Sequence, residues 1–405
     1  MSNVIEQKKV DVELKDDVLL SVRHLSQHFG PLKAVDNVSF DIKKGEVFGL
    51  VGESGCGKTT TGRSILKLYD ITGGDVIFKG VRICAGVKNY QDEIEKAKAD
   101  FKAGNENAMG KEELAKFIAE KKEAIRSAKN DQKNCDKEYS AKLVEALNAE
   151  YKPRIDAATG EEKKALMAEY KYQLRKAKNT KLVTQIQMIF QDPIASLDPR
   201  MTVRDIIAEG LIIQGETNKQ VIDKKVYEML ELVGLVADHA SRYPHEFSGG
   251  QRQRIGVARS IIMNPDLIIA DEPVSALAVS IQAQVINLLN DLRDKFGLTI
   301  LFIAHDLSVV KYFSDRIGVM YYGKMVELAD SDELFLNPLH PYTKSLLSAI
   351  PLPDPIYEKA RKRVSYNPLA AHDYSVDQPT FREVKPGHFV MCNQAEYDEY
   401  MAILK

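Results

Sequence analysis

The chain has 405 residues, enough for about two or three domains with a substantial hydrophobic core. Its 56 Lys and Arg residues nearly balance its 58 Asp and Glu residues, so the net charge of -2 gives no global sign of a nucleic-acid-binding protein, although a local basic patch stays open. The four cysteines form no CxxC pair, which argues against a zinc site, an iron–sulfur quartet or a disulfide framework and favours a reducing cytosol.

The sequence predicts neither a secretory signal nor a membrane-spanning segment. Residues 1–17 are polar, lack the apolar run of a secretory signal and are expected to form a loose N-terminal extension. No run of 18 apolar residues occurs, so we expect a chain that does not span a membrane by itself but could dock onto a protein that does.

The first regular elements alternate strands with a glycine-rich loop and a helix. Strand-like alternation covers residues 18–29 and 34–42, and a turn leads to the apolar run 47–52. A glycine-rich loop follows this run, then a predicted helix over 59–67 and a strand over 74–80.

Residues 85–182 differ in composition and are rich in Lys, Glu and Ala. Apolar residues recur there at helical spacing, and Gly104, Gly110, Pro153 and Gly160 are expected to break the pattern. We predict a helical hairpin or small coiled coil inserted into another domain. A single helix from Lys111 to Tyr151 would be about 60 Å long.

Strands and helices resume after the insertion and alternate to about residue 350. Strand signals lie at 184–192, 266–271 and 298–305, and helical signals lie at 203–240 and 279–295. This alternation predicts an α/β domain over residues 18–350 with a mostly parallel sheet covered by helices. The tail, residues 351–405, is expected to be a small accessory region.

The segment GESGCGKTT fits the Walker A pattern G-x-x-x-x-G-K-[ST], with a strand before it and a helix after it. Its glycines allow backbone N–H groups to surround phosphate oxygens at a helix N-terminus. Lys58 is predicted to reach the β and γ phosphates, and the Thr59 hydroxyl to bind Mg²⁺. A chance glycine-rich turn is the alternative, but it explains neither flanking element.

The apolar segment LIIA ends in two adjacent acids, Asp271 and Glu272. Such a pair could be an ordinary helix N-terminus, where negative charge is favoured. Its place at the end of a buried strand favours instead a Walker B carboxylate, with Asp271 on Mg²⁺ and Glu272 polarising the attacking water.

A second glycine element, FSGGQRQR, precedes a helix and makes a second anion-binding N-terminus. With it the sequence resembles the ATP-binding cassette (ABC) ATPases, in which this element is the signature motif. The resemblance implies a P-loop fold with a RecA-like core, an antiparallel β subdomain and a helical subdomain. It also implies head-to-tail dimers, in which each ATP lies between the Walker A loop of one subunit and the signature of the other.

The resemblance assigns further roles in order along the chain. Gln191 stands at the Q-loop position, His305 at the switch histidine and Phe29 at the aromatic residue that stacks on adenine. The predicted catalytic residues are Lys58, Gln191, Glu272 and His305, and the predicted metal ligands are Thr59, Gln191 and Asp271. The residues predicted to bind ATP are Phe29, Gly52, Glu53, Ser54, Gly55, Cys56, Gly57, Lys58, Thr59, Thr60, Ser248, Gly249, Gly250 and Gln251.

Three longer segments, at 191–203, 243–260 and 337–355, resemble the ATPase subunits of oligopeptide and dipeptide importers, in particular the F-type of a D/F pair. The later segment 381–392 also suits that group, and since only Cys392 stands there we predict no metal cluster. The resemblance implies Mg²⁺-ATP hydrolysis at the cytoplasmic face of the membrane. It also implies a related ATPase as heterodimer partner, two membrane subunits and an extracellular peptide-binding lipoprotein.

Other interpretations stay open at this point. The same machine could import nickel or glutathione, and a soluble ABC ATPase or a silent ATP-binding regulator are further alternatives. The single Walker A motif and the near-neutral charge disfavour a nucleic-acid partner. The insertion is either a solvated appendage or a docking arm for the partner ATPase, the membrane subunits or lipid headgroups.

The D-loop departs from the family pattern, because Ala278 stands where SALD ends in aspartate. One hypothesis is that this alanine weakens the partner's ATP site or the coupling between the two sites. The alternatives are that backbone contacts of the loop suffice, or that the alanine is an introduced change.

Overall fold

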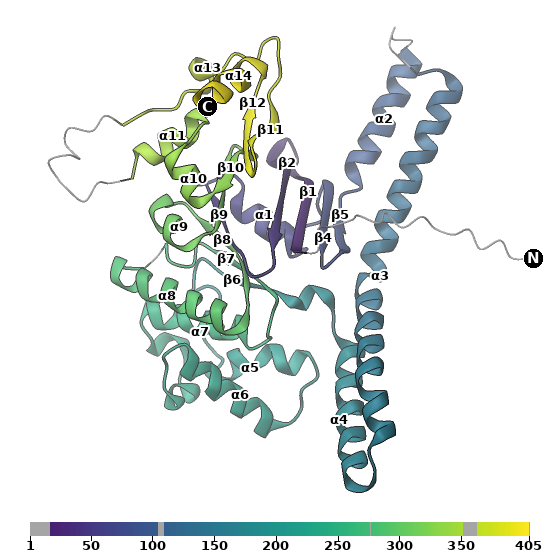
Figure 1. Ribbon diagram of the computed structural model, residues 1–405, viewed down its shortest axis with the longest axis vertical. Helices are drawn as coiled ribbons and strands as arrows, with labels where there is room; N and C mark the ends of the chain where they lie inside the picture. The colour runs from purple at the N-terminus through teal and green to yellow at the C-terminus, as the bar shows by residue number, and fades with distance from the viewer. Residues whose placement is uncertain (1–16, 104–108, 276, 351–362, 405) are drawn as a thin grey trace, which may run out of the picture.

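The structure is a computed structural model that describes residues 17–103, 109–275, 277–350 and 363–404. The predicted N-terminal extension therefore lies outside the described residues apart from Asp17, and so do residues 351–362 of the tail. Two β-sheets and the helices that cover them form the body of the protein, and long helices stand beside it (Figure 1).

The smaller sheet is antiparallel and has four strands in the order β2-β1-β4-β5. Three of its strands match the predicted segments, whereas the fourth, β5, was not predicted. Buried Val, Leu, Ile and Phe side chains of these strands form one core with side chains on one face of the larger sheet. The strands are β1 (Val18–Phe29), β2 (Leu32–Lys43), β4 (Gly73–Phe78) and β5 (Val81–Ala85).

The larger sheet has eight strands in the order β11-β12-β10-β9-β3-β8-β7-β6. Its strands β6, β7, β8, β3 and β9 run parallel, so the loops that follow them meet at one edge. That edge carries the predicted motifs. The strands are β3 (Val47–Val51), β6 (Ile186–Ile189), β7 (Leu267–Asp271), β8 (Thr299–Ala304), β9 (Arg316–Tyr321), β10 (Lys324–Asp330), β11 (Thr380–Lys385) and β12 (His388–Cys392).

Helices cover the larger sheet and extend below it in Figure 1, where α5, α6 and α7 pack together as a helical subdomain. Their buried apolar faces share one core with the sheet. The prediction of an α/β fold of ABC type is confirmed. The helices are α1 (Lys58–Ile65), α5 (Val203–Ile213), α6 (Lys219–Leu232), α7 (Gly249–Ile261), α8 (Val279–Phe296), α9 (Leu307–Phe313), α10 (Ser331–Leu336) and α11 (Pro341–Ser348).

The insertion consists of α2 (Lys88–Ala103), α3 (Lys111–Ala157) and α4 (Gly160–Asn179). Helix α3 has 47 residues, which corresponds to about 70 Å. Helix α2 lies against its first part and α4 against its last part, so α3 is the shared member of two helical hairpins (Figure 1). The helical insertion was predicted, but a single hairpin was too simple.

The expectation that Pro153 breaks the helix is wrong. Helix α3 continues through Pro153 to Ala157. A proline removes one backbone hydrogen bond, and here that loss falls in the last turns of the helix. The same turns are held from the side, because the Tyr151 hydroxyl donates to Glu169 of α4 at 3.0 Å.

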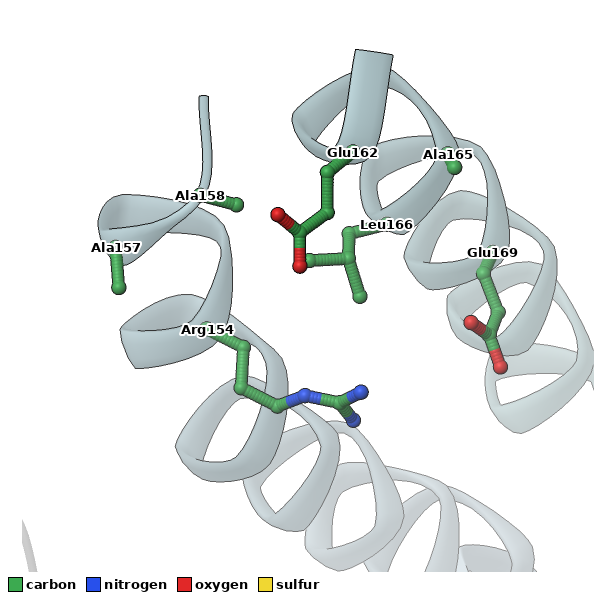
Figure 2. A pocket seen from close by; sticks show the side chains of 7 residues that line it. All are labelled: Arg154, Ala157, Ala158, Glu162, Ala165, Leu166 and Glu169. Atoms are coloured by element: carbon green, nitrogen blue, oxygen red, sulfur yellow. The ribbon is translucent and has the colours of Figure 1, made fainter. Parts of the chain in front are cut away.

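The far end of this hairpin is polar and loosely packed. Figure 2 shows Arg154 of α3 and Glu162 and Glu169 of α4 pointing into the space between the two helices. Leu166 also points into that space, and three alanines, Ala157, Ala158 and Ala165, line the rest of the opening. The hairpin is therefore partly open at this end, next to the buried Tyr151.

The C-terminal unit, defined as the described residues 363–404, contains α13 (Pro368–Ala371), β11, β12 and α14 (Gln394–Ile403). Strand β12 pairs with β10, with Val390 opposite Glu327, and so extends the larger sheet. A small core of its own includes Val384, Val390 and Tyr400. These strands were not predicted, since the tail was interpreted only as an accessory region.

Two further observations concern membrane-spanning helices and cysteines. Within the described part of the chain, no helix combines the length and apolar character needed to cross a lipid bilayer. All four cysteines are buried and present as free thiols.

Candidate nucleotide-binding site

The Walker A loop lies between β3 and α1, at the edge where the parallel strands end. Gly52 and Gly57 have φ angles of 152° and 104°, which side chains disfavour. A Cβ atom on Gly52 would lie 2.2 Å from the Met320 carbonyl oxygen, and one on Gly57 would lie 2.2 Å from the Ala34 carbonyl oxygen. The glycines of the motif are therefore required by neighbouring backbone as well as by any phosphate.

Lys58 folds back into its own loop. Its side chain is buried, and Nζ donates to the carbonyl oxygens of Gly52 at 2.8 Å and Glu53 at 2.9 Å. An ammonium group has three donors and no acceptor, so these carbonyls hold it ready inside the loop. A phosphate oxygen that enters the loop would replace them as its partner.

Asp271 lies at the end of β7 and is fully buried beside α1. Its Oδ1 accepts a hydrogen bond from the Thr59 hydroxyl at 2.7 Å, and its Oδ2 has no partner among the described residues. Burial raises the pKa of Asp271, and the Thr59 hydrogen bond opposes that shift. A hydroxyl next to a free carboxylate oxygen is an oxygen donor set that suits Mg²⁺.

Glu272 has a left-handed backbone conformation, with φ 45°, that is uncommon for a residue other than glycine. Two contacts hold it there. Its N–H donates to the Ile303 carbonyl at 2.9 Å, and its carbonyl accepts from the Ser275 hydroxyl at 3.1 Å. Strained residues of this kind cluster at functional sites. Here the left-handed backbone conformation gives Glu272 a different surrounding from its buried neighbour Asp271.

Gln191 and His305 converge on the Glu272 carboxylate. The Gln191 amide donates to Oε2 at 3.0 Å, and His305 Nδ1 lies 3.2 Å from the same oxygen. With Glu272 ionised, Nδ1 is the donor. The three residues follow β6, β7 and β8, so the parallel sheet brings together side chains separated by 81 and 33 positions.

This carboxylate opens into a cleft of about 500 Å³, which the three converging residues share with residues that were not predicted. Asp192 and Ser275 line it beside Ser54 of the Walker A loop. A sequence signal existed for both, since each is adjacent to or within a recognised motif. Gln191 remains a predicted metal ligand, although its amide nitrogen faces Glu272 here.

Phe29 lies at the end of β1 and is 43% exposed. Its ring packs edge-to-face against Tyr69, with 5.3 Å between centroids and 83° between planes. An exposed aromatic ring held at its edge could stack on a flat base. The role in adenine binding stays a prediction, and Tyr69 is a neighbour that the sequence did not identify.

The signature residues begin α7, with Ser248 at its N-cap. The Ser248 hydroxyl accepts from the Gln251 N–H at 3.3 Å, and the Gln251 side chain accepts from the Ser248 N–H at 3.0 Å. This reciprocal pair fixes the helix start and leaves Ser248 exposed. No signature residue lines the cleft around Glu272, so this chain does not complete that cleft with its own signature.

A strand–loop–helix phosphate cradle, a buried acid beside its threonine, and a converging Gln, Glu and His define an ATPase of the ABC class. Family models agree. The model described as ABC transporter matches residues 35–169 and 141–275, and the model of the oligopeptide/dipeptide transporter C-terminal region matches residues 326–375.

Curated relatives are similar over nearly the full chain. The oligopeptide transport ATP-binding protein OppF of Bacillus subtilis (strain 168) is 49% identical, covering 94% of this chain and 98% of that protein. The dipeptide transport ATP-binding protein DppF of Lactococcus lactis subsp. cremoris (strain MG1363) is 43% identical, covering 98% and 97%. This chain therefore belongs to the family of oligopeptide and dipeptide transport ATP-binding proteins.

Solved structures support the fold alone. The structure of cbiO1 from Clostridium perfringens, described as part of the ABC transporter complex cbiONQ, superposes with a TM-score of 0.51 at 18% identity. The superposition covers 79% of this chain and 92% of that one.

As an ABC ATPase the chain binds and hydrolyses a nucleotide.

Proposed function

We propose that this chain is the subunit that hydrolyses ATP to energise oligopeptide import, at the cytoplasmic face of the membrane. The observation that carries the catalytic part is the convergence of Gln191 and His305 on Glu272, next to the Walker A loop. Peptide as the cargo class rests on the family, whose characterised members are named for oligopeptide and dipeptide transport.

The residues divide the work of hydrolysis between them. Glu272 orients a water molecule for attack on the γ-phosphorus and takes up its proton as the bond to the β-phosphate oxygen breaks. Lys58 binds the phosphate oxygens on which negative charge accumulates. His305 holds the Glu272 carboxylate in place. Thr59 and Asp271 would hold Mg²⁺, which neutralises charge on the β and γ phosphates when bound.

The partners of this chain are the other subunits of the proposed membrane transporter. We infer a heterodimer with a related ATPase beneath two membrane subunits, fed by an extracellular peptide-binding lipoprotein. The exposed signature residue Ser248, which lies outside the chain's own cleft, supports a site shared with the second ATPase. Ile194, three residues beyond Gln191, is 63% exposed and is the kind of apolar residue that a membrane subunit would cover.

The proposal is tested with Glu272→Gln in the transporter purified with its membrane subunits. The amide keeps the contacts to Gln191 and His305 but cannot take a proton, so ATP hydrolysis and peptide uptake should fall by about 10²- to 10⁴-fold while ATP still binds. Glu231→Gln, the same change at an exposed position of α6 outside the cleft, is the control. Hydrolysis that survives in the Gln variant would contradict the assignment.

Ala278 is the N-cap residue of α8 and gives it no side-chain hydrogen bond. Aspartate or asparagine there would both cap the helix and stabilise the chain by about 1 kcal/mol. Only aspartate supplies the carboxylate of the D-loop. If the alanine weakens the partner's ATP site, Ala278→Asp raises the ATPase rate of the assembled transporter and Ala278→Asn does not. Equal rates in all three proteins would reject that hypothesis.

A further inference from the structure

A backbone N–H of the Walker A loop donates a hydrogen bond to a side chain of a helix far along the chain. Tyr342, in the first turn of α11, is 1% exposed, and its hydroxyl accepts from the Glu53 N–H at 3.0 Å. Glu53 is therefore fixed on both sides of its Cα, because its carbonyl oxygen accepts from Lys58 Nζ at 2.9 Å. Tyr342 thus holds the residue on which the predicted phosphate-binding lysine rests.

The segment that carries Tyr342 is itself anchored by a buried carboxylate. Glu327 of β10 is fully buried, and it accepts from the N–H groups of Leu339 at 2.8 Å and His340 at 3.1 Å. His388 of β12 lies 2.9 Å from the same carboxylate through Nε2. A buried carboxylate with three partners is a rigid anchor, and its partners come from two different elements.

His340 links the anchor to Tyr342. Its Nδ1 accepts from the Tyr342 N–H at 3.1 Å and so caps α11. Burial, and then the neighbouring His372 and Lys344, lower the pKa of His340 to about 3. The ring is therefore neutral at physiological pH, and a neutral ring can serve as the acceptor that this cap needs.

We propose that Tyr342 is a positioning residue for ATP binding, which keeps the Walker A turn in its phosphate-binding shape through the hydrogen bond to Glu53. When Lys58 leaves the Glu53 carbonyl for a phosphate, the bond from Tyr342 remains and the turn does not relax. The proposal rests on the proposed role of this loop in binding ATP, and it extends the site to a segment 289 residues away.

The test is Tyr342→Phe in the full-length chain, with ATP and Mg²⁺ as the probe. The ring remains, so packing is kept, but the Glu53 N–H loses its acceptor and the empty loop populates its binding shape less often. The dissociation constant of ATP should rise about five- to tenfold. At saturating ATP, phosphates organise the loop, so kcat of the assembled transporter should stay within about twofold.

Tyr366→Phe is the matched control, since Tyr366 packs against Tyr342 with ring centroids 5.5 Å apart but bonds His372 at 3.0 Å instead of the loop. This variant should bind ATP as the parent does. An unchanged dissociation constant in Tyr342→Phe overturns the proposal, and so does an equal rise in Tyr366→Phe. A parent chain that binds no ATP would instead contradict the proposed function, so the two failures are distinguishable.

Discussion

Two regions have been added to the ATPase body, and they are attached in different ways. The C-terminal unit extends the larger sheet through β12, and its His388 reaches the fully buried Glu327 of β10. The insertion of α2, α3 and α4 lies beside the smaller sheet, where Cys135 of α3 joins the core of that sheet and a polar cluster links α3 to β5. Arg82 of β5 donates through Nε to Asp131 of α3 at 2.9 Å and through Nη2 to Ser127 at 3.0 Å.

Burial separates the two attachments further. The side chains of His388 and Glu327 are 1% and 0% exposed, whereas that of Asp131 is 32% exposed. A buried charge that loses its partner is costly, and a solvated one is not. We therefore expect the C-terminal unit to support the structure that shapes the nucleotide site, and the insertion to be the more separable of the two regions.

The largest expected effect comes from removing the buried anchor. Glu327→Ala leaves two backbone N–H groups and His388 without their acceptor, so the free energy of unfolding should fall by about 3–5 kcal/mol. Asp131→Ala, the corresponding change at the insertion, should cost about 1 kcal/mol because water can reach the site. Urea denaturation of both variants measures the difference, and equal losses would contradict the contrast drawn between the two regions.

The buried segment that contains His340 should also lose stability in acid. The pKa of His340 is lower in the folded chain, about 3, than the ordinary value of 6.5, so the unfolded chain binds the extra proton first. Stability is complete above pH 6.5 and is lost as pH falls toward 3, by about 1.4 kcal/mol per pH unit. His340→Asn keeps a cap acceptor but cannot be protonated, and it should lose about 2 kcal/mol less than the parent by pH 5.

Unfolding curves between pH 7 and pH 5 measure this difference. His245→Asn, at an exposed position of the chain, is the control and should follow the parent. A parent-like acid slope in His340→Asn would show that other groups govern the acid response.

A shortened insertion tests whether it is separable. The Tyr170 hydroxyl of α4 bonds Asn148 of α3 at 2.5 Å, so the two helices can be joined there by a short glycine turn in place of residues 149–169. We expect ATP hydrolysis and peptide uptake within about twofold of the parent, since every anchor to the smaller sheet is kept. Normal hydrolysis with lost uptake would favour the docking arm over the solvated appendage.

The smallest effect is expected where the insertion reaches the helical subdomain. The Tyr172 hydroxyl of α4 donates to Glu216, between α5 and α6, at 2.7 Å. Tyr172 is 51% exposed, so water replaces the bond in Tyr172→Phe and stability should change by less than about 0.5 kcal/mol. A larger loss, seen by thermal unfolding, would mean that the insertion braces the helical subdomain.

Much of the fold followed from local patterns. The strand before the Walker A loop, the helix after it and the helical insertion were predicted because each is encoded by a short periodic segment. The predicted break at Pro153 is wrong because packing against α4 outweighs one lost hydrogen bond near a helix end. Strands β11 and β12 were missed: β11 pairs only with β12, and β12 joins the sheet through β10, which lies about 60 positions earlier.

The sequence by itself determined the chemistry of the nucleotide site. Lys58 and Thr59 could be named because a phosphate cradle needs glycines, a lysine and a hydroxyl at fixed short spacing, and Asp271 because it ends an apolar strand. The tertiary structure alone decided that Tyr342 and Glu327 support that cradle. The Tyr342 contact joins segments 289 positions apart, and the Glu327 contact to His388 joins segments 61 positions apart. Only a packed sheet with a dry interior makes such hydrogen bonds form and makes their loss costly.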